Sequence, residues 1–176
     1  MEILADDLLL RPPVNTDLPA VTDAFADPEI VRFISGVPVP YELRHAARWL
    51  EKVDREWEHG NERTFAIVET RAPRLLGMIS VRLYEGGSLG YWLTPSARGR
   101  GIMTRAVEAL VSWAMNEQGI RRLTLTTHVE NDASQRVALR AGFVRIGVED
   151  GHEPPYRDGT TRRVVFELSS AVHEAQ

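Results

Sequence analysis

Residues 90–107 have the sequence GYWLTPSARGRGIMTRAV, and this stretch decides how the whole chain is interpreted. A β-forming segment ends in a proline, Gly99 and Gly101 follow, and apolar residues then recur at helical spacing. The first N–H groups of a helix lack intrahelical partners, and the helix dipole adds partial positive charge there. Glycines let a ligand approach the backbone, so the turn predicts an anion site assisted by Arg98 and Arg100. A ligand-free arginine–glycine turn is compatible with the same residues.

The spacing within this turn excludes two common phosphate-binding loops. No Lys-Thr or Lys-Ser pair follows the second glycine, which excludes the P-loop of nucleotide hydrolases. The glycines also do not match the dinucleotide-binding fingerprint, and the preceding strand belongs to a predicted meander. The anion must therefore be identified from the rest of the chain.

The composition predicts one soluble domain over residues 1–176, with 43% hydrophobic and 26% charged residues. The net charge of −4 gives no basic field for a nucleic-acid partner. The absence of cysteine excludes disulfides, thiolate zinc sites and a cysteine nucleophile. The N-terminal segment lacks the pattern of a signal peptide, and no segment approaches the roughly 18 apolar residues of a membrane span. We therefore expect a cytoplasmic protein that binds no membrane.

Hydrophobic periodicity and turn residues predict an α/β (α+β) fold. The expected strands cover residues 8–11, 63–70, 75–84, 88–94, 122–129, 143–148 and 163–168. The expected helices cover residues 18–34 (one or two helices), 41–58, 102–117 and 133–141. Asp27 and Pro28 have the residue types of an N-cap and a first helical position, which indicates that a second helix starts there.

A second motif, NDASQRVALRAGF at residues 131–143, follows the quoted stretch after one helix and one strand. The two motifs at this separation resemble the GNAT superfamily of acyl-CoA-dependent N-acyltransferases. Within it, the sequence is similar to the Rim-type branch of ribosomal-protein N-terminal acetyltransferases, from LLLRPP to the last strand. The resemblance implies a mixed, mostly antiparallel seven-stranded sheet flanked by helices, with a splay between two strands that holds acyl-CoA.

The resemblance also implies a binding site for acetyl-CoA as cosubstrate. In this superfamily the backbone amides of the turn bind the pyrophosphate, and the strand before it pairs with pantetheine. A polar residue just after the fifth strand touches pantetheine, although the same residue type also serves as a helix N-cap. Carried over to this sequence, the binding residues are Tyr91, Trp92, Leu93, Arg98, Gly99, Arg100, Gly101, Ile102, Met103, Thr104 and Asn131.

The expected catalytic residues are Ser134 and Glu153. Many GNAT enzymes have a tyrosine that protonates the leaving thiolate four residues before the Gly-Phe pair, but here Ala138 occupies that place. In the Rim-type branch the serine of N-x-x-S stabilises the thiolate instead, which points to Ser134. A glutamate after the sixth strand acts as base, and Glu153 matches it. His128 is the alternative base, and His152 lies near Glu153 in the sequence.

Other interpretations of these residues remain open at this point. Glu149, Asp150, Glu153 and Asp158 could suggest a metal cluster, but their spacing matches no calcium loop, so no metal is expected. The acceptor is expected to be a protein N-terminal amine or a small amine such as an aminoglycoside or polyamine. Succinyl-CoA is an alternative donor, and a non-catalytic acyl-CoA-binding module is the alternative from another class. An exposed edge strand would allow a homodimer.

Overall fold

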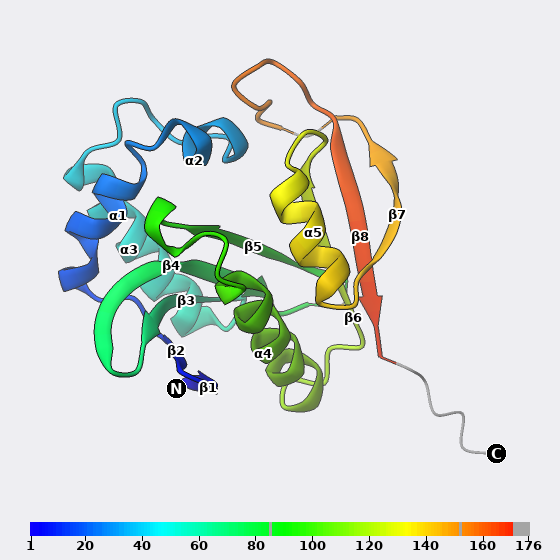
Figure 1. Ribbon diagram of the computed structural model, residues 1–176, viewed down its shortest axis with the longest axis horizontal. Helices are drawn as coiled ribbons and strands as arrows, with labels where there is room; N and C mark the ends of the chain where they lie inside the picture. Colours follow the sequence, from blue (N-terminus) through cyan, green and yellow to red (C-terminus); the bar gives the residue numbers. More distant parts are fainter. Residues whose placement is uncertain (85, 152, 171–176) are drawn as a thin grey trace.

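The computed structural model describes residues 1–170 except 85 and 152 (Figure 1), and all of its strands belong to one sheet. The strands are β1 (Ile3–Ala5), β2 (Leu8–Arg11), β3 (Glu62–Glu69), β4 (Ala72–Arg82), β5 (Gly87–Leu93), β6 (Arg122–His128), β7 (Val144–Glu149) and β8 (Arg163–Ser169). The helices are α1 (Leu18–Ala24), α2 (Pro28–Phe33), α3 (Leu43–His59), α4 (Ile102–Asn116) and α5 (Asp132–Arg140).

The mixed, mostly antiparallel sheet is confirmed, with eight strands in the order β1-β2-β3-β4-β5-β6-β8-β7. The seven expected strands are all present. The additional strand, β1, has only three residues, and it pairs with β2 through a tight turn in which Asp6 has a φ of 55°. A three-residue segment between acidic residues is too short to show an alternating pattern, so its pairing could not be predicted.

The boundaries of two helices follow from the capping residues that the sequence shows. The Asp27 side chain accepts a hydrogen bond from Glu29 N–H at 2.9 Å, which starts α2 at Pro28. Gly60, in the left-handed region with a φ of 77°, ends α3. Residues 25–27 separate α1 from α2, so the expected region 18–34 contains two helices.

Two hydrophobic clusters lie on opposite faces of the sheet. The larger cluster joins α4 and α5 to inward-facing residues such as Phe65, Ile79 and Leu125. The smaller one packs α1, α2 and α3 against Ala66 and Met78, which neighbour Phe65 and Ile79 in their strands and so point the other way. Figure 1 shows α4 and α5 in front of the sheet and α3 behind it. No described helix has the length and apolarity to cross a membrane.

The strands β5 and β6 diverge along their length. They are the parallel neighbours in the sheet, and their pairing covers only Gly87–Leu89 against Leu123–Leu125. Beyond Leu89, β5 continues to pair with β4 as far as Leu93. The edge of residues 90–93 that faces β6 is therefore left without a strand partner, which produces the splay expected from the sequence.

Candidate active site

A cleft of about 1100 Å³ passes through the sheet at this splay. Successive residues of a strand point to opposite faces, and the cleft is lined by consecutive residues of β5 and of β6, from Ser88 to Leu93 and from Thr124 to Thr127. It is therefore bounded by residues of both faces. Eleven of the thirteen site residues expected from the sequence line it: Tyr91, Trp92, Leu93, Arg98, Gly99, Gly101, Ile102, Met103, Thr104, Asn131 and Ser134.

The N-terminus of α4 opens into this cleft. Gly99 and Gly101 have φ values of 73° and 70°, and a Cβ added to either would meet no heavy atom within 4 Å. The first intrahelical hydrogen bond of α4 is donated by Arg105 N–H to Gly101 O at 3.2 Å. Within the described residues no side chain caps this end. The N–H groups of residues 102–104 are therefore available to an anion.

The arginines of the turn contact carboxylates from distant segments of the chain. Arg98 forms an ion pair with Asp27, the N-cap of α2, and also donates to Leu93 O at 3.4 Å. Arg100 pairs with Glu69 of β3 at 2.6 Å. These contacts connect the turn to the start of α2 and to the end of β3. Both guanidinium groups are thus engaged by carboxylates, while the backbone N–H groups of residues 102–104 are free hydrogen-bond donors.

The unpaired edge of β5 presents backbone groups to the cleft. Thr94 N–H donates to Leu76 O of β4 at 2.8 Å. Polar groups of successive residues in a strand point to alternate edges, so those of Leu93 and Tyr91 point away from β4 and toward the splay. This edge can hydrogen-bond an extended ligand as an added strand would.

The start of α5 brings Asn131 and Ser134 to the opposite wall of the cleft. Asn131 is the N-cap, and its Oδ1 accepts the Ser134 N–H at 3.0 Å. The expected capping role is thus present in the structure, and the amide nitrogen of Asn131 is not part of that bond. Ser134 is half-buried, and its hydroxyl lies 2.9 Å from the phenol oxygen of Tyr91.

The side chain of Tyr91 is a site feature that the sequence analysis missed. It was expected to contribute only backbone groups, but its phenol reaches from β5 to α5 and lies 3.3 Å from Ser134 O as well as 2.9 Å from Ser134 Oγ. Burial raises the pKa of Tyr91 far above its usual value of 10, and the hydrogen bond with Ser134 opposes this only in part. The phenol therefore keeps its proton at neutral pH.

This raised pKa predicts a loss of stability at high pH. The folded protein holds the Tyr91 proton more tightly than the unfolded chain does, so the stabilisation is complete below pH 10 and decreases as the pH rises above it. One such group changes the free energy of unfolding by about 1.4 kcal/mol per pH unit in this range. We expect urea unfolding at pH 8, 10 and 11 to show a shallower decline for Tyr91→Phe than for the wild type.

Tyr84→Phe is the matched control for this measurement, because the Tyr84 side chain is 54% exposed. Burial also raises the pKa values of Tyr41 and Tyr156, so part of the decline remains in Tyr91→Phe. An equal slope for the wild type and Tyr91→Phe would show that Tyr91 keeps its ordinary pKa in the folded protein.

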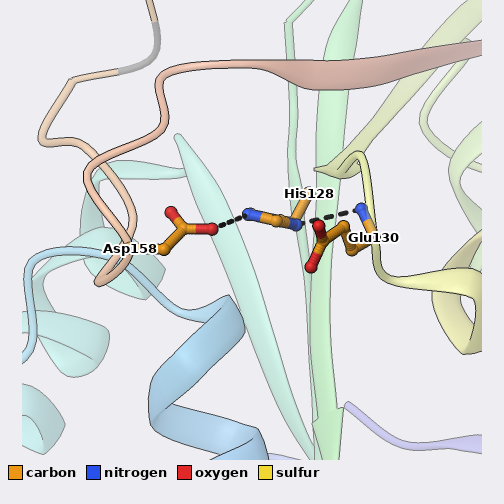
Figure 2. Close-up of side chains that lie close together, drawn as sticks. All are labelled: His128, Glu130 and Asp158. Atoms are coloured by element: carbon orange, nitrogen blue, oxygen red, sulfur yellow. Dashed lines mark hydrogen bonds and ion pairs between the residues drawn. The ribbon is translucent and has the colours of Figure 1, made fainter.

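His128 anchors the loop between β7 and β8, as Figure 2 shows. Its buried ring accepts the Glu130 N–H at Nδ1, and its Nε2 lies 3.0 Å from the Asp158 carboxylate. Since Nδ1 accepts, the ring proton is on Nε2 and is donated to Asp158. The hydrogen bond from Thr160 N–H, and next the one from His128, hold the pKa of Asp158 below its usual value. With both nitrogens engaged, His128 has no free lone pair for use as a base.

The same loop packs against α2 and against the segment between α2 and α3. Arg157 donates to Val31 O at 3.3 Å and to Val37 O at 2.6 Å. A Cβ on Gly36 would lie 3.1 Å from Pro154 Cγ. Glu153 comes just before this proline; it is exposed and is not among the described residues that line the cleft. His152 lies outside the described residues.

The acidic residues of this region have basic partners. Glu149 forms an ion pair with Arg163 at 3.0 Å, and Asp150 forms one with Arg162 at 3.6 Å. Glu130, which lines the cleft, pairs with Arg32 of α2. Glu130 could not be singled out from the sequence, since nothing in its local pattern indicates that it lies at the cleft.

These geometric features, namely a strand splay, a free helix N-terminus and a polar wall from α5, occur in a chain that also matches a protein family. The family described as "Acetyltransferase (GNAT) domain" matches residues 7–144. This chain belongs to the GNAT acetyltransferase family. The matched region contains every element that forms the splay and the turn, so the GNAT fold inferred from the two motifs is confirmed.

Several proteins similar to this GNAT protein are named as ribosomal-protein acetyltransferases. The ribosomal-protein-serine acetyltransferase of Escherichia coli (strain K12) is 36% identical over 77 residues, which are 42% of this chain and 43% of that enzyme. The aligned part is thus less than half of that relative. RimL, a ribosomal L7/L12 α-N-protein acetyltransferase solved in complex with coenzyme A, has a TM-score of 0.83 at 20% identity and covers 96% of this chain and 98% of its own.

A third neighbour has the same fold over almost the full length. The ribosomal-protein-S5-alanine acetyltransferase of Vibrio fischeri has a TM-score of 0.84 at 17% identity, with 98% of each chain covered. At such identities the likeness establishes the fold of this GNAT protein and leaves its acceptor to be inferred from its own site.

Proposed function

We propose that this protein transfers an acetyl group from acetyl-CoA to a primary amine, and that the amine is the N-terminal α-amine of a protein or peptide. The observation that carries the proposal is the cleft, which joins a free helix N-terminus, an unpaired strand edge and a serine hydroxyl in one space. The relatives named for ribosomal-protein acetylation support an acceptor that is a protein.

Each wall of the cleft has a separate task in this reaction. The N–H groups of residues 102–104 bind the pyrophosphate, and the unpaired edge of β5 pairs with the pantetheine amides. The N–H of Leu93 faces the splay and polarises the thioester carbonyl, where negative charge develops as the amine attacks. Ser134 donates a hydrogen bond to the departing thiolate. The reaction needs no covalent intermediate on the enzyme.

The acceptor amine enters from the side formed by α1, α2 and the loop between β7 and β8. An α-amino group ordinarily has a pKa of roughly 7.7–8.0, so a modest base suffices to remove its proton at neutral pH. We assign this step to Glu153, acting directly or through water. The assignment is supported by the anchoring of its loop beside the cleft through His128 and Arg157. The engaged nitrogens of His128 argue against the alternative base.

A panel of acceptors tests the proposed function. Thiol release from acetyl-CoA, and in parallel from succinyl-CoA, is measured with four acceptors: lysine-containing peptides with a free N-terminus, the same peptides with an acetylated N-terminus, spermidine and an aminoglycoside. We expect turnover with the free α-amines, because about a third of an α-amino group is already neutral near pH 7.5, whereas a lysine amine is almost entirely protonated. Preference for a small amine or for succinyl-CoA would contradict the acceptor or the donor, and coenzyme A binding without turnover would indicate a binding module.

The base is tested with Glu153→Gln in the same assay. Removal of a general base costs about 10²–10⁴-fold in rate, and a base that acts through water falls at the lower end. Asp150→Asn is the matched control, because Asp150 is an exposed carboxylate in the same loop. Full turnover in Glu153→Gln together with a loss in Glu130→Gln would transfer the role to the carboxylate that lines the cleft.

A further inference from the structure

The pair formed by Tyr91 and Ser134 is a contact in the cleft that neither of the two motifs accounts for. Tyr91 lies in β5 and Ser134 in α5, 43 residues apart, and the splay separates their backbones. Their hydroxyl oxygens nonetheless lie 2.9 Å apart, which is a close contact for two hydroxyls. This hydrogen bond bridges the two walls of the cleft.

The proton count at this pair restricts what each hydroxyl can do. Tyr91 has one hydrogen to donate and two acceptors within reach, Ser134 Oγ at 2.9 Å and Ser134 O at 3.3 Å. If the phenol donates to the carbonyl, the serine hydroxyl can donate to the phenol and its hydrogen is then used. If the phenol donates to Oγ instead, the serine hydrogen must point to a different acceptor.

Negative charge on a sulfur in the cleft would favour the second arrangement. A hydroxyl that accepts a hydrogen bond becomes a stronger donor, because the bonds in a chain polarise one another. The buried phenol stays protonated, so it can donate throughout the reaction. Ala138 occupies the place where many GNAT enzymes have their acidic tyrosine, and it is fully buried in the core. Tyr91 supplies a phenol at the cleft from β5 instead of from α5.

We propose that Tyr91 is a positioning residue that directs the Ser134 hydroxyl toward the leaving sulfur, an inference that rests on the proposed acetyl transfer. As the amine nitrogen bonds to the carbonyl carbon, the C–S bond breaks and its electron pair stays on sulfur. Tyr91 Oη–H donates to Ser134 Oγ, and Ser134 Oγ–H donates to that sulfur. No proton leaves Tyr91, since the proton lost by the amine balances the one gained by the thiol through solvent.

The test is a double-mutant cycle with Tyr91→Phe, Ser134→Ala and the variant that combines them. We expect Tyr91→Phe to lower kcat about tenfold, the effect of one lost hydrogen bond. The KM for acetyl-CoA and the Kd for coenzyme A should stay within twofold of the wild type. The combined variant should be no slower than Ser134→Ala alone, because the phenol acts only through the serine.

Several outcomes would overturn the inference. These are full activity in Tyr91→Phe, a raised KM with unchanged kcat, or a tenfold loss that multiplies with that of Ser134→Ala. If the wild type acetylates none of the amines, the proposed acetyl transfer itself is wrong. The other outcomes contradict only the role of Tyr91, so the two failures can be told apart. If Tyr91→Phe has a lowered Tm, 3-fluorotyrosine at position 91 replaces it. Its more acidic phenol is a stronger donor, so kcat should rise, and an unchanged or lower kcat would contradict the proposal.

Discussion

Gly101→Val should raise the Kd for coenzyme A at least 100-fold, whereas Gly119→Val should leave it within twofold of the wild type. Gly101 is the residue before α4, and the space beside its Cα is empty for at least 4 Å. Gly101 directly precedes residues 102–104, whose N–H groups are free, and it lines the same cleft. A valine side chain at position 101 would block the approach of a pyrophosphate to those groups. The 100-fold change in Kd corresponds to about 2.7 kcal/mol of binding free energy.

Gly119 provides an unusually close control for this change. It follows the other end of α4, has the same φ of 70°, and likewise has no heavy atom within 4 Å of an added Cβ. Both valines therefore carry the same backbone strain of about 1–2 kcal/mol. Calorimetric titration with coenzyme A then separates strain from lost anion contact, and equal shifts of Kd in the two variants would reject the role assigned to the turn.

Ser134→Ala is the second change with a large expected effect, a loss of about 100-fold in kcat. Removing a hydrogen-bond donor from a site where charge develops costs about 10²–10³-fold, and a thiolate spreads its charge over a large atom, which favours the lower value. The affinity for coenzyme A should not change. Asn131 caps α5 through the backbone N–H of Ser134, so alanine keeps the capping bond and the helix start remains intact.

Ser112→Ala is the matched control for this variant. Ser112 is an exposed serine of α4, and its hydroxyl accepts a hydrogen bond from the side-chain amide of Asn116 at 3.1 Å, one turn further along the same helix. The measurement is kcat at saturating acetyl-CoA for the wild type, Ser134→Ala and Ser112→Ala. Ser134→Ala with the same kcat as Ser112→Ala would mean that the thiolate leaves without help from this hydroxyl.

The parts of the site that could be predicted are those specified by short-range patterns. The N-cap role of Asp27, the ends of α3 and α4, and the place of Asn131 before α5 all depend on residues within one helical turn. The splay was expected from the resemblance, and its structural basis is that β5–β6 pairing covers only three residue pairs. Ser134 and Glu153 stay predictions as catalytic residues.

The parts that could not be predicted depend on contacts between segments far apart in the chain. Arg98 and Asp27 are 71 residues apart, and Tyr91 and Ser134 are 43 apart. Such pairs are determined by strand register and by the path of the helices across the sheet, and neither is visible in a local pattern. For the same reason the paired nitrogens of His128 could not be foreseen. A cytoplasmic location and a homodimer also stay predictions.

The divergence of β5 and β6 leaves an opening in the sheet that bears on how two reactants reach each other. A pocket that opens on one face has a single entrance, so two ligands must enter it by the same route. The opening between β5 and β6 is a passage that residues from both faces of the sheet border. For the proposed transfer we therefore expect acetyl-CoA and the acceptor to approach this opening from opposite faces of the sheet. A bulky acceptor therefore needs to insert only its extremity, while the rest of it stays outside.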